Sequence, residues 1–283
     1  MKDNVGFKWQ KENMNINRDG EVAYLTFPSF ESVTDIKHGF STRLGGASKG
    51  IYESMNLSFT RGDSEVAVME NFNRISKAIG FSVESIVCSD QTHTNNVIKV
   101  GKADCGNGIL QKKPYADVDG MITNEKGVTL ATFYADCVPL YVIDPVNQAI
   151  GLSHSGWKGT VLKIGKVTIK KMMEEYGTNP ADVLVAIGPS ICQDCYEVSE
   201  DVINEFRESF TDEQCRDMII DKGNGKYQLD LWKACVYNFL EAGVAFENVT
   251  VGGLCTCCNS DKMFSHRASH GKRGNLGAFL MID

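Results

Sequence analysis

The stretch that most constrains the fold of this chain runs from Ala135 to Thr160 and reads ADCVPLYVIDPVNQAIGLSHSGWKGT. Two apolar runs flank the segment Asp144-Pro145-Val146-Asn147, whose Asp, Pro and Asn residues are typical of turns. The pattern predicts a β-hairpin, with Cys137 at the start of its first strand and His154 near the end of its second. Two side chains that can bind a metal therefore lie at the same end of one hairpin.

The register of this hairpin decides whether the two side chains face each other. If Asp144 pairs with Asn147 across the turn, Cys137 lies directly opposite His154. Directly opposed Cβ atoms are about 4.5–5.5 Å apart. Zinc bonds a thiolate at about 2.3 Å and an imidazole at about 2.0–2.1 Å, so such a pair could share one ion. A longer loop at the turn would shift the register by a residue or two.

Length and charge exclude some classes of protein. The chain has 283 residues, of which 42% are hydrophobic and 23% charged, so it can bury an ample core. The net charge of −7 argues against a protein that binds a phosphate backbone, and we expect no nucleic-acid partner. No segment approaches the roughly eighteen apolar residues of a membrane span, and we expect no membrane partner.

The ten cysteines have a different meaning in a reducing and in an oxidising compartment. The segment 1–30 alternates polar and apolar residues and lacks the apolar run of a secretory signal. We therefore expect a cytoplasmic location. In that compartment the ten cysteines are mostly reduced, and each one is a buried hydrophobe, a ligand or a nucleophile.

Hydrophobic periodicity predicts strands and helices that interleave through the second half of the chain. The chain contains no repeat, low-complexity tract or Pro/Ser-rich linker, which favours one mixed α/β domain over 1–283 with about the first 20 residues peripheral. The predicted strands are 21–27, 37–42, 85–93, 96–100, 118–123, 128–137, 183–187, 249–254 and 277–282. The predicted helices are 64–79, 159–176, 198–210 and 231–242.

Three residues are candidate metal ligands and catalytic residues. His93 lies in the polar segment SDQTHTNNV, where a surface histidine without a special role is the usual interpretation. Cys137 follows a strand, and a lone buried cysteine is usually inert. His154 lies between the small residues Ser153 and Ser155, which leave space around its ring. Together the three supply one thiolate and two imidazoles, and three protein ligands plus water is the catalytic zinc arrangement. Iron and copper are alternatives, since copper binds such sites more tightly than zinc and thiolate also favours Cu(I).

Other groups carry weaker signals. Cys192-Gln193-Asp194-Cys195 lacks the context of a redox motif, and Cys255-Thr256-Cys257-Cys258 has no second pair at zinc-finger spacing, so we expect both to supply surface or core thiols. The loop from Arg43 to Ser48 could bind an anion through free N–H groups or could be a simple turn. Arg267 lies in a small cationic segment, FSHRASHGKRGN, for which a solvated loop is the alternative.

Several motifs together resemble a known family. QTHTNNV, ADCVPL, AIGLSHSGWKGT, AIGPSI and FSHR occur in this order, with HGFSTRLGGASKGIYESMNLS upstream. They closely resemble the laccase-domain proteins, described both as polyphenol oxidases and as purine nucleoside phosphorylases. The resemblance covers the chain from about His38 to Ile282. It implies a single-domain α/β/β/α sandwich with mixed sheets, and a zinc ion held by His93, Cys137 and His154.

The resemblance also implies an activity. The implied reactions are phosphorolysis of adenosine, inosine and methylthioadenosine, with deamination of adenosine as a side activity. Copper-dependent oxidation of phenols is less favoured, because five histidines cannot fill both a trinuclear cluster and a blue-copper site. The expected substrates are thus a purine nucleoside and phosphate. The candidate substrate-binding residues are Arg43, Gly45, Gly46, Ser48 and Arg267.

Two other mechanisms use the same residues. Without a metal, Cys137 could be the nucleophile and His154 the base of a cysteine hydrolase or amidase. A binding module with a structural metal would need a fourth protein ligand, which the sequence near these residues does not supply. The sequence leaves open whether the chain is a monomer or a homodimer.

Overall fold

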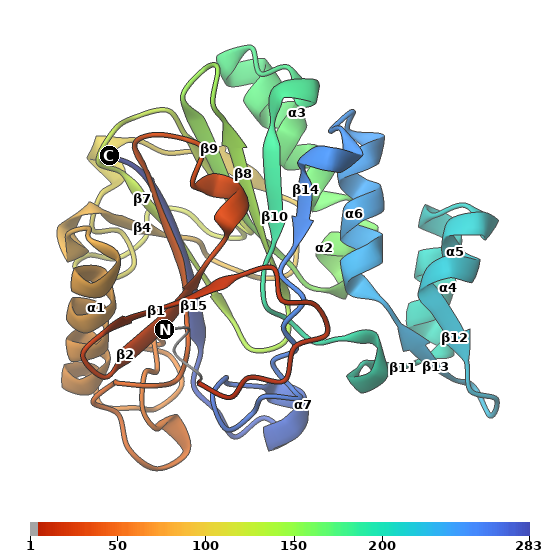
Figure 1. Cartoon of the computed structure of the whole chain (residues 1–283), viewed down its shortest axis with the longest axis horizontal. Helices are drawn as coiled ribbons and strands as arrows, with labels where there is room; N and C mark the ends of the chain where they lie inside the picture. Colours follow the sequence, from red (N-terminus) through yellow and green to blue (C-terminus); the bar gives the residue numbers. More distant parts are fainter. Residues whose placement is uncertain (1–4) are drawn as a thin grey trace.

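Two six-stranded sheets pack face to face in the computed structural model, which describes residues 5–283 (Figure 1). The strands of the first sheet, in spatial order, are β1 (Asn15–Asp19), β2 (Val22–Thr26), β3 (Ile36–Ser41), β15 (Leu276–Ile282), β7 (Thr129–Tyr134) and β4 (Ile86–Cys88). Those of the second are β14 (Val249–Val251), β10 (Leu184–Ile187), β8 (Val138–Asp144), β9 (Ala149–Ser155), β6 (Gly120–Thr123) and β5 (Val97–Lys99). Both sheets are mixed, since β4–β7 and β10–β14 are parallel while β15–β7 and β8–β9 are antiparallel.

Helices cover the outer face of each sheet (Figure 1). The first sheet carries α1 (Glu65–Ile79), and the second carries α2 (Trp157–Val161), α3 (Ile164–Tyr176) and α6 (Leu231–Glu241). Each of the three interfaces between layers has its own apolar core. The predicted α/β/β/α sandwich with mixed sheets is therefore confirmed.

Strand β8 shows why both faces of the central sheets are apolar. Leu140 and Val142 pack in the core beneath the helices, while Tyr141 and Ile143 belong to the core between the sheets. Successive side chains of a strand point to opposite faces, so a strand buried on both sides needs an unbroken apolar run. This explains the sequence VPLYVI in the predicted hairpin.

The hairpin forms as predicted, but its register was wrong by two residues. Asp144 pairs with Ala149, and His154 pairs with Pro139. The Asp144 carboxylate accepts the N–H groups of Val146 and Asn147 at 3.0 Å, which stabilises a four-residue turn. A shift of two residues keeps the side chains on the same faces, so Cys137 and His154 still point to one side of the sheet.

The helix predicted at 64–79 is confirmed, with the Ser64 hydroxyl accepting the N–H of Ala67 and Gly80 ending the helix at a φ of 97°. The helix predicted at 159–176 is instead divided into α2 and α3, because Lys163 adopts a φ of 60° between them. The strand predicted at 85–93 ends at Cys88, so His93 lies in a loop. None of the helices formed by residues 5–283 combines the length and hydropathy required to cross a bilayer.

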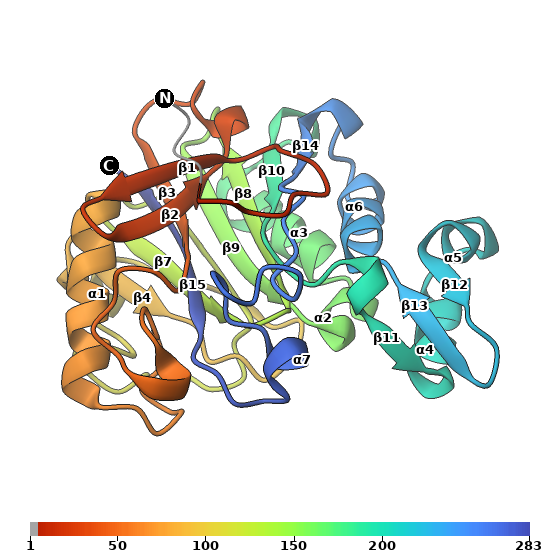
Figure 2. The same cartoon turned by 60° about the horizontal axis from the view of Figure 1, so that its bottom comes forward.

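A small lobe projects from one side of the sandwich and was not predicted (Figure 2). It consists of β11 (Glu197–Ser199), β12 (Ile219–Asp221), β13 (Lys226–Leu229), α4 (Glu200–Ser209) and α5 (Asp212–Met218). The helix expected at 198–210 thus begins at Glu200, after a short strand.

The N-terminal segment contributes to the first sheet. β1 pairs along its length with β2, and Met14 is buried in the core between the sheets. Residues 15–19 therefore form the edge strand of the first sheet. Residues 1–4, also expected to be peripheral, lie outside the described residues.

Candidate metal centre and active-site cavity

Three side chains distant in sequence meet at one end of the central hairpin. The ligand atoms of His93, Cys137 and His154 all lie within 4.8 Å of one another. His93 comes from the loop after β4, Cys137 directly precedes β8, and His154 lies near the end of β9. His154 is buried, whereas His93 is exposed. The fold therefore assembles the three residues that the sequence analysis selected as metal ligands.

A buried carboxylate orients His154. The Nδ1 atom of His154 lies 2.7 Å from Oδ1 of Asp119, whose side chain is fully buried. Burial raises the pKa of Asp119, but hydrogen bonds from His154 and from the N–H groups of Thr94 and Thr92 outweigh it and lower the pKa to about 2. The carboxylate thus stays charged and accepts the Nδ1 proton. This leaves the Nε2 lone pair of His154 available to a metal.

The same carboxylate also shapes the loop that carries His93. It accepts the N–H groups of Thr92 and His93 at 3.1 Å and that of Thr94 at 2.8 Å. His93 itself adopts a φ of 67°, in the left-handed region. Asp119 therefore positions both histidines of the group.

Sequence reasoning missed Asp119. The pairing of β6 with β9 places Gly120 opposite Ser153, and the neighbouring His154 N–H donates to the Asp119 carbonyl at 2.7 Å. The acidic residue just before the strand 120–123 was visible in the sequence. Only the pairing of that strand with β9 could have assigned it to His154.

Gly156 allows the three ligands to approach. A Cβ atom built on Gly156 would lie 2.5 Å from Nδ1 of His93 and 3.3 Å from Sγ of Cys137. The first distance is shorter than any van der Waals contact, so a larger residue would displace the His93 ring. The motif HSGW therefore needs glycine at position 156, because any side chain there would collide with the His93 ring.

The donor set fits a metal ion. One thiolate and two imidazoles suit zinc or copper, and three protein ligands leave a coordination position for water or substrate. Within residues 5–283, this group of mutually close His, Cys, Asp and Glu ligand atoms has three members.

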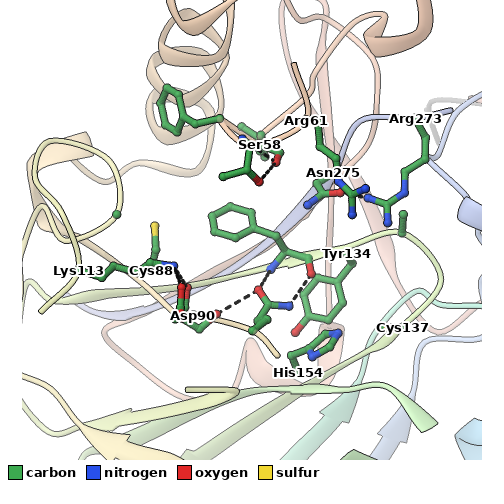
Figure 3. Close-up of a pocket in the computed structure, with 18 of the residues that line it drawn as sticks. Ser58, Arg61, Cys88, Asp90, Lys113, Tyr134, Cys137, His154, Arg273 and Asn275 are labelled. Atoms are coloured by element: carbon green, nitrogen blue, oxygen red, sulfur yellow. Dashed lines mark hydrogen bonds and ion pairs between the residues drawn. The ribbon is translucent and has the colours of Figure 1, made fainter. Parts of the chain in front are cut away.

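The three ligands all line a cavity of about 410 Å³, and Figure 3 shows Cys137 and His154 beside it. Another part of its lining is aromatic. The rings of Phe59 and Phe72 are stacked at 5.6 Å, and Phe133 meets Phe72 edge-on at 6.0 Å. The cavity has the size and the mixture of apolar and polar groups typical of a small-molecule site.

Two arginines supply positive charge to the cavity. Figure 3 shows Arg61 and Arg273 with their guanidinium groups next to one another. Burial and the nearby Arg61 lower the pKa of Arg273 to about 10. The Nε atom of Arg273 is buried without a hydrogen-bond partner, and neither arginine forms an ion pair with a carboxylate among residues 5–283. A buried donor without a partner is costly, so this pair is suited to an anion.

The two arginines proposed from the sequence for substrate binding point elsewhere. The Arg43 guanidinium donates to the carbonyls of Glu53 at 2.6 Å and Ser260 at 2.9 Å. Arg267 lies in the short helix α7 (His266–Ser269), and its guanidinium donates to the carbonyls of Cys195 and Glu197 at 3.1 and 2.9 Å. Neither residue lines the cavity. Both guanidinium groups bind backbone and hold loops in place.

The glycine-rich loop is likewise occupied by internal contacts. The N–H of Gly46 donates to the Ser54 hydroxyl at 3.0 Å, and the N–H of Ser48 donates to the Ser54 carbonyl at 2.9 Å. A Cβ on Gly45 or Gly46 would collide with backbone atoms at 2.4 Å or less. The loop from Gly45 to Ser48 therefore packs against neighbouring chain and does not line the cavity.

The chain is similar in sequence to one protein family and to bacterial proteins named purine nucleoside phosphorylases. The family model described as "Multi-copper polyphenol oxidoreductase laccase" matches residues 37–283. The purine nucleoside phosphorylase YlmD of Bacillus subtilis (strain 168) is 37% identical over 244 residues, which cover 86% of this chain and 87% of that protein. A purine nucleoside phosphorylase of Bacteroides thetaiotaomicron is 35% identical over 270 residues, covering 95% and 99% of the two chains.

A solved structure has the same fold. The crystal structure of the hypothetical protein YfiH from Bacillus licheniformis matches with a TM-score of 0.89 and 30% sequence identity. The match covers 95% of this chain and 99% of that chain, so the sandwich and its elements correspond over nearly their whole length.

Proposed function

The chain belongs to the multi-copper polyphenol oxidoreductase laccase family, and on that premise we propose that it is a zinc-dependent purine nucleoside phosphorylase. Its proposed substrates are adenosine, inosine and methylthioadenosine, together with inorganic phosphate. The observation that carries the proposal is a single cavity that joins a three-ligand metal group, two arginines, one with a buried Nε that lacks a hydrogen-bond partner, and an aromatic wall. The names of the relatives support the same reaction.

The aromatic wall suits the purine base. Phe59 and Phe133 are partly buried, so their rings can still contact a planar ligand. Offset stacking of aromatic rings contributes about 0.5–1.5 kcal/mol beyond the apolar area that it buries. Lys113 and Asp90, which form an ion pair at the cavity wall, can bind the polar edge of the base.

The arginine pair suits phosphate. Guanidinium groups bind phosphate oxygens with two parallel hydrogen bonds, and the two charges offset those of the dianion. In phosphorolysis a phosphate oxygen forms a bond to the ribose C1′ while the bond from C1′ to the base nitrogen breaks. The purine leaves with the bonding electron pair and gains a proton. Arg61 and Arg273 would hold the nucleophile in place for this displacement.

His93, Cys137 and His154 would hold the zinc ion. A zinc ion with three protein ligands lowers the pKa of bound water to about 7 and polarises oxygen atoms of a substrate. Deamination of adenosine, in which water replaces the amino group at C6 and ammonia leaves, needs an activated water, so we propose it as a side activity. The chain's own contribution is the orientation of His154 by Asp119.

Copper-dependent phenol oxidation receives less support from the histidines. Of the five in the chain, His93 and His154 belong to the metal group, while the buried Nε2 of His38 accepts the N–H of Phe27 at 2.8 Å. A multi-copper centre requires more imidazole ligands than this group offers.

A metal-free cysteine hydrolase is the second candidate. The His154 ring contacts the Cys137 thiol and, through Nδ1, the Asp119 carboxylate, which is the order of a Cys-His-Asp triad. Burial lowers the pKa of His154, but the neighbouring Cys137 and Asp119 raise it to about 9. A thiolate beside an imidazolium is a nucleophile when no metal binds it.

Dependence on phosphate distinguishes these reactions. With adenosine and phosphate, the purified protein is expected to release adenine and ribose 1-phosphate, with slower formation of inosine. Without phosphate, adenine release should cease while inosine formation continues. Cys137→Ser should abolish both reactions. Adenine release that persists without phosphate, or in Cys137→Ser, would rule out the phosphorylase. Labelling of Cys137 by an amide-directed electrophile in metal-free protein would then favour the hydrolase.

A further inference from the structure

Four cysteines form a second cluster, separate from the cavity. The Sγ atoms of Cys192, Cys195, Cys255 and Cys258 all lie within 4.8 Å of one another. In sequence they form two Cys-x-x-Cys pairs far apart in the chain, and we expected each pair to supply surface or core thiols. The structure brings the two pairs together in one group of four sulfur atoms.

The topology of the second sheet explains why the two cysteine pairs lie close together. One pair follows β10 and the other follows β14, and these two strands are parallel neighbours. The carboxyl ends of parallel neighbours lie at the same edge of a sheet, so the segments that follow them leave side by side. An isolated parallel bridge between Ser190 and Cys255 continues the pairing to the cysteines.

The separations of the sulfur atoms match those around one tetrahedral ion. Sγ of Cys258 lies 3.4 Å from Sγ of Cys195 and 4.0 Å from Sγ of Cys192. A zinc–sulfur bond of about 2.3 Å gives a tetrahedron with sulfur atoms about 3.8 Å apart. A disulfide would bring two sulfur atoms to about 2.03–2.05 Å, and all four cysteines are free. A cluster of several iron ions would hold the sulfurs farther apart, because iron and sulfide would lie between them.

Backbone groups already point at the sulfur atoms. Sγ of Cys255 accepts the N–H of Cys192 at 3.2 Å and the N–H of Cys258 at 3.4 Å. Donors of this kind stabilise negative charge on sulfur, as hydrogen bonds do around bound metals. Cys192 and Cys255 are buried, with exposed fractions of 4% and 0%, so water has little access to them.

We propose that Cys192, Cys195, Cys255 and Cys258 bind one Zn²⁺ ion in a closed structural site. Four thiolates complete the tetrahedron, which leaves no position for a substrate, in contrast to the three-ligand group of the cavity. Thiolates select zinc among the divalent ions that prefer tetrahedral geometry. This site is additional to the proposed function and does not depend on it.

A zinc ion at this site would connect the lobe, the N-terminal region and the segment just before Cys137. Cys195 lies two residues before β11, where the lobe begins. The segment with Cys255 binds the N-terminal region through the bridge between Trp9 and Leu254. It also holds the residue before Cys137, because the Thr256 hydroxyl donates to the Asp136 carboxylate at 2.6 Å. The ion would therefore support the chain that carries a ligand of the first metal group.

Counting metal ions in matched variants tests the proposal. The full chain, purified in reductant without added metal, is expected to hold about two zinc ions, and Cys255→Ser and Cys137→Ser about one each. Cys257→Ser is the matched control, because Cys257 lies between two of the ligands but outside the group, and it should keep both ions. Zinc and iron are measured together by mass spectrometry of the metals.

Cobalt gives a readout that does not require Cys255→Ser to fold. Cys137→Ser protein loaded with Co²⁺ should show the strong sulfur-to-cobalt absorption of a tetrahedral thiolate site, since the first group has lost its only thiolate. Three results would overturn the proposal: loss of all zinc in Cys137→Ser with no such absorption, iron in place of zinc, or disulfides among the four cysteines in freshly purified protein. Cys137→Ser removes only the first site, so zinc retained by this variant reports on the four-cysteine site alone. The phosphorylase assignment is tested separately, by the phosphate dependence of adenine release.

Discussion

At the scale of single residues, Asp119 has the widest influence on the metal group. Its carboxylate binds the His154 ring and the backbone on both sides of His93, so one buried charge orients two ligands. Outer partners of this kind fix the tautomer of a ligating histidine and raise its basicity. Removing this charge should therefore weaken metal affinity more than it lowers the stability of the fold.

Asp119→Asn should weaken zinc binding by about 10- to 100-fold, because the amide no longer stabilises the His154 Nδ1 proton by charge. Competition with a chromophoric chelator measures the affinity. Asp117→Asn is the matched control, since Asp117 lies two residues before Asp119 but its carboxylate accepts the Thr92 hydroxyl. Equal affinities in the two variants would contradict the role of Asp119.

Arg273→Gln should raise the KM for phosphate by about tenfold or more, because a hydrogen bond to a charged group contributes about 1.5–3 kcal/mol. Deamination of adenosine should change little, since it does not use phosphate. Arg43→Gln is the comparison, as the Arg43 guanidinium donates to backbone carbonyls and lies over the Phe264 ring outside the cavity. A larger effect on KM from Arg43 than from Arg273 would return the phosphate site to the glycine-rich loop.

His38 should make stability depend on pH. Burial lowers its pKa from 6.5 to about 4 in the folded chain. Below pH 6.5 the unfolded chain binds a proton that the folded chain does not, so the free energy of unfolding should fall by about 3 kcal/mol between pH 6.5 and pH 4. Denaturant unfolding of the wild type and of His38→Gln isolates this contribution. An identical pH dependence in both proteins would exclude it.

At the scale of elements, the β8–β9 hairpin illustrates how a turn sets the register of a site. The Asp144 carboxylate accepts two N–H groups of the turn and the side-chain amide of Asn147, and it is 1% exposed. These contacts favour a four-residue turn over the two-residue turn assumed from the sequence. The register that follows places His154 opposite Pro139, with Cys137 just beyond the strand.

Asp144→Ala removes the hydrogen bonds that the carboxylate accepts in the turn and should lower the free energy of unfolding by about 1–2 kcal/mol. The loss stays this small because the exposed N–H groups of the turn can bind water in place of the carboxylate. Denaturant unfolding of zinc-loaded protein measures the loss. Asn147→Ala removes only the side-chain contact and should cost less. If the two variants lose the same stability, the backbone contacts of Asp144 do not stabilise the turn.

At the scale of the whole molecule, contacts between distant segments connect the lobe and the N-terminal region to the sandwich. The Leu229 N–H of the lobe donates to the Tyr196 carbonyl at 3.1 Å, and the Asn259 side chain accepts the Lys8 N–H at 2.7 Å. The four-cysteine cluster lies where these parts converge. We therefore expect the chain to behave as one domain.

Thermal unfolding should show one transition, and a protease cut in the exposed turn at residues 222–225 should leave two fragments that co-elute from a sizing column. The reason is that β13, which follows the cut, pairs with β11 and β12, which precede it. Two fragments that separate without denaturant, each with its own unfolding transition, would contradict the single domain.

The sequence by itself determined the features that depend on neighbouring residues. Helical spacing with Ser64 before it and Gly80 after it predicted α1, because a helix and its caps are local. The apolar runs of the hairpin predicted buried strands, because strand periodicity is also local. The family motifs carried the fold class and the three candidate ligands.

Only the tertiary structure decided which distant residues share a site. Asp119 reaches His154 through the pairing of β6 with β9, and Arg61 lies next to Arg273 at the cavity. The two cysteine pairs join because β10 and β14 are parallel neighbours. Strand pairing brings together residues that are far apart in the chain, and the free energy of these contacts depends on the packing of whole sheets. Local residue spacing therefore does not predict which distant residues share a site.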